Sequence, residues 1–185
     1  MRIILAGLLG AIAMFVWTSI AHMATPLATV GFSRIPHEAA VLAAMQDGVG
    51  AKSGLYVFPW VDPKDPKMME KSAALMKTNP SGLLLYHPPG ASADMLPLVS
   101  AEFAKELVQA LIAAFLLSFV AIAPYWCRVG YVTAIGLFAA LGTDTSYLIW
   151  YGFPLDYTLA NIAINLIGAF FAGLVIALWL GRKPA

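Results

Sequence analysis

The chain has 185 residues, of which 61% are hydrophobic and 11% are charged, with a formal net charge of +1 at pH 7. A soluble globular domain contains about half hydrophobic and about a quarter charged residues. This composition excludes an ordinary soluble domain and indicates a multi-pass membrane protein.

Four apolar stretches are each close to the roughly 20 residues that a helix needs to cross about 30 Å of hydrocarbon. They cover residues 3–21, 107–123, 129–149 and 159–180. Charged side chains precede the second stretch at helical spacing, so that helix is expected to start in the headgroup region at about residue 101. We therefore predict a membrane all-α fold, a bundle of four transmembrane helices with a small α+β external insert.

The predicted organisation has three parts. Residues 1–22 form the first span, 23–100 form the insert, and 101–185 form a unit with spans at about 101–123, 129–150 and 158–180. The first span could instead be a secretory signal cut after Ala21. Its apolar core of about 19 residues exceeds the roughly 7 to 15 of a signal peptide, which favours an uncleaved signal anchor.

Basic residues in short loops predict the orientation, because Lys and Arg are retained on the cytoplasmic side. The loop over residues 151–158 contains no Lys or Arg. The span ends on the other side of the membrane from this loop carry Arg2, Arg128, Arg182 and Lys183. We expect a bacterial inner-membrane protein with both termini in the cytoplasm and the insert outside.

The insert shows signals for two helices and two strands. The first helix is expected over 36–46, with Gly48 as its stop, and the first strand over 54–60. Asp65 is expected to cap a second helix that starts at Pro66 and ends near Lys77. The second strand is expected over 82–87. The two strand sequences resemble one another, Gly-Leu-Tyr-Val-Phe and Gly-Leu-Leu-Leu-Tyr. They predict a short β-α-β unit whose strands pair and whose helix covers one face.

The insert has neither a disulfide nor a charge bias to define its partners. Its six basic side chains are matched by six acidic ones, which indicates neither nucleic-acid binding nor a polybasic lipid-binding patch. Cys127 is the only cysteine and lies outside the insert. A segment this small must therefore be held by packing, by the lipid bilayer or by a partner.

Polar residues within the spans are the first place to search for a functional site, because an ionisable group in hydrocarbon is costly. Asp144 lies in the third span, and Asn161 and Asn165 lie at a similar depth on one face of the fourth. We hypothesise a polar cluster of these three side chains, joined by Glu106 and by Thr145 and Ser146.

Two interpretations of this cluster are open. It can be a proton or cation site, or a pocket for a small solute. Alternatively, Asp144 only accepts hydrogen bonds from the asparagines, and the stripe continued by Gly168 and Ala172 lets helices approach closely. Small residues in the first span also predict helix packing, either within the chain or against another one. These are Ala6, Gly7, Gly10 and Ala11.

The sequence contains no pattern of a catalytic or cofactor site. The three histidines, His22, His37 and His87, lack metal-ligand spacing, and no nucleophile elbow, phosphate-binding glycine loop or dinucleotide fingerprint is present. We expect no enzymatic activity, no catalytic residue, no cofactor and no metal. Pro124 ends the second span, so the second and third spans are expected to form an antiparallel hairpin.

The predicted architecture resembles that of uncharacterised families of small bacterial inner-membrane proteins. It consists of one anchor span, a compact insert with a Gly-Leu-Tyr-Val-Phe-Pro segment, and three closely connected spans. The resemblance implies no activity. From the residues we expect an accessory or interaction subunit of an envelope complex, which binds other membrane subunits or itself. The alternative is a small oligomeric transporter or channel that uses Asp144 and the asparagine stripe.

Overall fold

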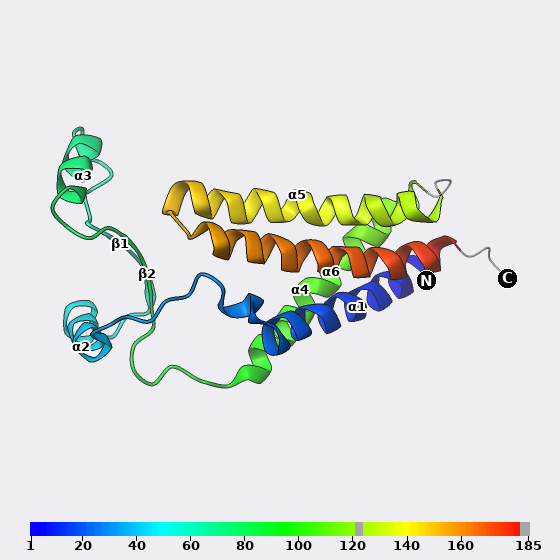
Figure 1. Ribbon diagram of the computed structural model, residues 1–185, viewed down its shortest axis with the longest axis horizontal. Helices are drawn as coiled ribbons and strands as arrows, with labels where there is room; N and C mark the ends of the chain where they lie inside the picture. Colours follow the sequence, from blue (N-terminus) through cyan, green and yellow to red (C-terminus); the bar gives the residue numbers. More distant parts are fainter. Residues whose placement is uncertain (121–123, 182–185) are drawn as a thin grey trace. The chain divides into compact units, whose positions relative to one another are not determined.

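The computed structural model describes residues 1–120 and 124–181 (Figure 1). The chain divides into two compact units. The first combines residues 1–32 with the described part of 94–185 and is helical. The second is the insert, residues 33–93.

The first unit contains four long helices and one short turn of helix. These are α1 (Arg2–Ala24), the 3₁₀ turn η1 (Pro26–Thr29), α4 (Met95–Ser118), α5 (Tyr125–Tyr151) and α6 (Leu155–Gly181). α1 packs against both α4 and α6, and α6 packs along α5. The contact between α4 and α5 is small. The expected hairpin of these two helices is therefore not the main packing, because α4 is held by α1.

Local signals explain where these helices begin and end. The side chain of Asp94 accepts a hydrogen bond from the Leu96 amide, so α4 starts at Met95, before the expected start near residue 101. Gly152 adopts φ 69° after the last turn of α5, a left-handed conformation that glycine accepts without strain. Residues 121–123, the expected end of the second span, lie outside the described residues.

In the described part of the chain, three helices are long and apolar enough to cross a membrane, namely α1, α5 and α6. This finding supports a transmembrane protein. The fourth expected span, α4, is not among them. Every membrane-length segment of α4 contains three charged residues, Glu102, Lys105 and Glu106.

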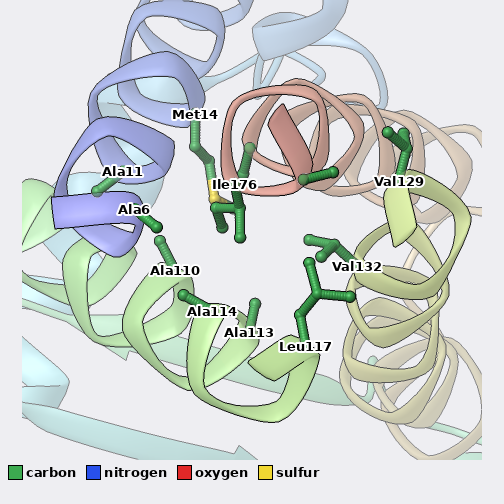
Figure 2. Close-up of a cluster of buried hydrophobic side chains, with 12 residues drawn as sticks. Ala6, Ala11, Met14, Ala110, Ala113, Ala114, Leu117, Val129, Val132 and Ile176 are labelled. Atoms are coloured by element: carbon green, nitrogen blue, oxygen red, sulfur yellow. The ribbon is translucent and has the colours of Figure 1, made fainter. Parts of the chain in front are cut away.

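The core of this unit is built from small side chains (Figure 2). Met14 of α1 and Ile176 of α6 point toward one another at its centre. Around them lie alanines and a few larger residues of all four helices: Ala6, Ala11, Ala110, Ala113, Ala114, Leu117, Val129, Val132, Ala172 and Ala177. Small side chains allow helix backbones to approach closely, which is the usual way in which helices associate in lipid.

The small residues of the first span pack within this chain. A Cβ added at Gly7 would lie 2.6 Å from Leu111 Cδ2 of α4, and one at Gly10 would lie 2.6 Å from Ile176 Cγ1 of α6. Gly7 therefore allows close contact with α4, and Gly10 allows close contact with α6. The Trp17 indole adds an interhelical hydrogen bond of 2.9 Å to the carbonyl oxygen of Ile164.

The insert contains α2 (Glu38–Val49), β1 (Gly54–Phe58), α3 (Met68–Met76) and β2 (Gly82–Tyr86). The two strands pair as expected, but they are antiparallel, with Gly54 opposite Tyr86 and Phe58 opposite Gly82. The expected β-α-β arrangement is therefore wrong. The connection that contains α3 leaves and returns at the same end of the ribbon, so it makes no crossover.

The two helices of the insert differ from expectation at their ends. α2 continues through Gly48 to Val49 and is capped by Gly50, which adopts φ 79°. α3 begins at Met68 rather than Pro66, after a turn in which Asp65 accepts a hydrogen bond from the Lys67 amide. The Lys71 ammonium group also binds Asp65, and these two interactions hold the pKa of that carboxyl below its ordinary value.

The insert has almost no hydrophobic core of its own. Among its described residues, Tyr86 is the only buried hydrophobic side chain, and its hydroxyl donates to the Gly50 carbonyl oxygen at 2.9 Å. Neither α2 nor α3 packs extensively on the sheet within the described part of the chain. The helix that was expected to cover one face therefore leaves the sheet open.

Candidate functional site

A cavity of about 410 Å³ lies within the helical unit and is lined by residues of all four long helices. Most of the lining is apolar. The polar lining residues are Lys105 and Gln109 of α4, Thr143 and Asp144 of α5, and Asn165 of α6. The volume falls within the range of roughly 300 to 1,000 Å³ that is typical of small-molecule sites.

The cavity exists because α4 and α5 hardly touch and because the side chains between them are small. α4 contributes Ala110 and Ala113, α5 contributes Gly136 and Ala140, and α6 contributes Ala169. None of these side chains can extend across the space. Close α5·α6 packing and close α1·α4 packing therefore leave a gap on the remaining side of the bundle.

Asp144 and Asn165 form the polar pair of this cavity. Asp144 of α5 and Asn165 of α6 both line this cavity, and the Asn165 amide lies close enough to interact with the Asp144 carboxyl. One carboxyl oxygen of Asp144, Oδ2, is buried and has no hydrogen-bond partner among the described residues. A buried carboxyl oxygen without a partner is costly, so this atom is available to a ligand, a water molecule or a cation.

Other members of the hypothesised cluster are bonded within their own helices. The Asn161 amide donates to the Tyr157 carbonyl oxygen at 2.9 Å, one turn earlier in α6. The Ser146 hydroxyl donates in the same way to the Gly142 carbonyl oxygen at 2.8 Å. Neither residue lines the cavity, and neither does Thr145. The structure thus brings together Asp144 and Asn165 and leaves the rest of the cluster apart.

Glu106 occupies a separate polar site between α1 and α4. It is fully buried, and its Oε1 accepts a hydrogen bond of 2.8 Å from the Thr18 hydroxyl of α1. Its second oxygen, Oε2, has no partner among the described residues. Glu106 does not line the cavity that contains Asp144. Its hydrogen bond with Thr18 joins α1 to α4.

The sequence-based hypothesis omitted three polar residues that the structure places at the cavity, Lys105, Gln109 and Thr143. The spacing of four between Lys105 and Gln109 places them on one face of α4, together with Ala113. That spacing was visible in the sequence. The spacing does not indicate which helix this face meets. The proximity of Lys105 and Gln109 to Asp144 is therefore seen only in the folded bundle.

Metal-ligating side chains do not gather in the part of the chain that the structure describes. No group of three His, Cys, Asp or Glu residues there is arranged to hold a metal ion. His22, His37 and His87 are exposed and lie on different elements or loops, and Cys127 is exposed near the start of α5.

Comparisons of this chain with protein-family models, with curated proteins and with solved structures give no match.

Proposed function

We propose that this protein is an accessory subunit of a bacterial envelope complex, anchored by its helical unit and bound to a partner protein through the insert. The observation that carries the proposal is the open aliphatic face of the two-stranded sheet. The partner supplies the apolar contacts that the insert itself lacks.

The pairing of the strands places four aliphatic side chains on that face. Leu55 lies opposite Leu85, and Val57 lies opposite Leu83. The exposed fractions are 65% for Leu55, 69% for Leu85 and 48% for Val57. Exposed apolar patches on soluble parts of proteins mark interaction sites. A sheet of only two strands also has free edges, to which a partner strand can add.

We further propose that α4 is a fourth span, although it carries three charged residues. From residue 108 on, exposed apolar side chains lie at spacings of four, three and four, on one face of the helix and its C-cap: Val108, Ile112, Phe115 and Phe119. Such a stripe is suited to contact with lipid chains. Of the charges, Glu106 is buried against α1, and Lys105 is paired with Glu102 in the first half of the helix.

The proposed topology places both termini in the cytoplasm and the insert outside the inner membrane. Arg2 and Arg128 line one pocket together with Leu180, so the starts of α1 and α5 and the end of α6 lie at the same end of the bundle. This common basic end supports a cytoplasmic location under the positive-inside rule. Arg182 and Lys183, which also entered that prediction, lie outside the described residues.

The accessory function is tested by affinity purification in mild detergent after mutation of the aliphatic face. We expect a partner that co-purifies with the wild-type protein to be lost from the double variant Leu55→Asn, Leu85→Asn. The control is Leu42→Asn, which changes an exposed leucine of α2. It should retain the partner.

A heteromeric complex that survives the double variant would reject this face as the binding surface. A wild-type protein that purifies only as a homo-oligomer would reject the accessory function itself. In that case the second candidate, a small oligomeric transporter or channel, would be preferred. The observation that favours this alternative is the cavity in which Asp144 Oδ2 has no hydrogen-bond partner among the described residues.

A further inference from the structure

A second, smaller cavity lies at the basic end of the helical bundle. Its volume is about 210 Å³, and it is lined by Arg2, Ile3, Leu117, Ser118, Arg128 and Leu180. These residues come from α1, α4, α5 and α6. The two arginines are 126 positions apart in the sequence, and only the folded bundle brings them to one pocket.

Both guanidinium groups lie against the C-terminal end of α6. Arg2 donates to the carbonyl oxygens of Trp179 and Leu180 at the end of α6, both at 3.4 Å. The Arg128 guanidinium lies directly against Gly181, where any Cβ would collide with it. Its Nε is buried and has no hydrogen-bond partner among the described residues. Arg128 therefore retains hydrogen-bonding capacity after folding.

The described parts of the chain segments that meet here contain no acidic side chain. No Asp or Glu occurs in residues 1–37, 107–120, 124–143 or 157–181. Two positive charges at one pocket without a nearby carboxylate side chain favour an anionic ligand. The planar guanidinium group binds phosphate through two parallel hydrogen bonds, which makes arginine well suited to phosphate recognition.

We propose that this pocket binds the phosphate group of an anionic membrane phospholipid. The polar part of the pocket, with both arginines and Ser118, takes the phosphate and headgroup. The apolar part, with Ile3, Leu117 and Leu180, contacts the glycerol and the first carbons of the acyl chains. The site is distinct from the cavity of Asp144, with which it shares no lining residue.

The test compares the full-length protein in phosphatidylglycerol and in phosphatidylcholine. Both lipids carry a phosphate, but the choline cation is disfavoured beside two arginines. Native mass spectrometry should show about tenfold stronger retention of phosphatidylglycerol, the effect expected for one charge-assisted contact. Thermal unfolding should show greater stabilisation by phosphatidylglycerol. Equal retention and equal stabilisation in the wild-type protein would overturn the proposal.

Three variants localise the effect. Arg128→Gln should abolish the preference, and Arg128→Lys should reduce it strongly while keeping the positive charge that topology requires. Arg34→Gln is the matched control, because this exposed arginine belongs to the insert, and it should leave the preference unchanged. Circular dichroism establishes that each variant is folded. A folded Arg128→Lys protein that keeps the full preference would reject this pocket.

A further experiment distinguishes a phospholipid ligand from a soluble phosphate compound. Glycerol 3-phosphate and inorganic phosphate, added to protein in phosphatidylcholine, should stabilise it much less than phosphatidylglycerol does. Equal stabilisation by the soluble anions would show that the ligand is a free phosphate compound and would reject the lipid.

Discussion

At the scale of single residues, two carboxyl groups in the helical unit have different surroundings. Asp144 lines an open cavity beside Asn165. Glu106 is fully enclosed between helices and is bonded to Thr18. Each has one buried carboxyl oxygen without a hydrogen-bond partner among the described residues. Only Asp144 lines the cavity, so it is the residue on which a transport function can be tested.

Asp144→Asn is expected to change stability little, because an amide can still form a hydrogen bond with Asn165. A hydrogen bond between helices in a membrane contributes only about 0.6 to 2 kcal/mol. Under the proposed accessory function, this variant accumulates, assembles and functions as the wild type does. The measurements are expression level, thermal unfolding in detergent, and a growth or flux assay.

The matched control is Asp156→Asn, the same chemical change at an exposed acid in the first turn of α6. Loss of function at Asp144 alone, with normal folding, would mean that the titratable charge is required. That result would place the transporter ahead of the accessory subunit.

At the scale of elements, the helical unit depends on close approach rather than on large side chains. Gly136 of α5 lies directly against Ala169 of α6, so that a Cβ at this position would overlap the Ala169 methyl group. Gly142, less than two turns later in the same helix, has open space at the corresponding point. The two glycines therefore belong to the same helix but differ in packing.

We expect Gly136→Ala and Gly142→Ala to have opposite effects on the free energy of unfolding. Overpacking costs about 1 to 3 kcal/mol, so Gly136→Ala should be destabilising. Alanine is favoured over glycine within a helix by roughly 0.5 to 1 kcal/mol, so Gly142→Ala should be neutral or stabilising. Thermal unfolding of both variants in the same detergent provides the comparison. Equal stabilisation by the two changes would contradict the α5·α6 interface described above.

The insert shows how much local sequence can and cannot predict. Gly-bounded runs of apolar residues correctly indicated both strands, and helix signals correctly indicated α2 and α3. The predicted β-α-β arrangement of the two strands was wrong, because short strands with an intervening helix can pair in either the parallel or the antiparallel direction. A helix between two strands normally indicates a parallel crossover. Here the return of the chain to the same end of the sheet, at Gly82, decided the outcome.

At the scale of the whole molecule, the proposed topology has consequences that do not depend on the insert's partner. A reporter enzyme that is active only in the cytoplasm should be active when fused after Ala185 or near Cys127. It should be inactive when fused near Thr78 in the insert. A second reporter that is active only outside the cytoplasm should show the reverse pattern at each site. Cytoplasmic activity at Thr78 would refute the assigned orientation.

Several features of this protein follow from the sequence by itself. Composition and the length of the apolar stretches indicated the membrane class. Neighbouring residues such as Asp94 and Gly152 set helix ends through hydrogen bonds and backbone conformation, although we expected α4 to start near residue 101 rather than at Met95. The glycines and alanines of the first span correctly indicated helix packing. These signals are local, because capping and helical periodicity act between residues only a few positions apart.

Only the tertiary structure decided which helix faces meet. Lipid chains and helix surfaces are similarly apolar, so an apolar pattern does not show whether a face contacts lipid or another helix. For this reason the sequence did not indicate that α4 packs on α1 rather than on α5, or that Asn161 is bonded within its own helix while Asn165 reaches Asp144. The convergence of Arg2 and Arg128 on one pocket has the same origin, since it depends on how four helices pack and not on any local pattern.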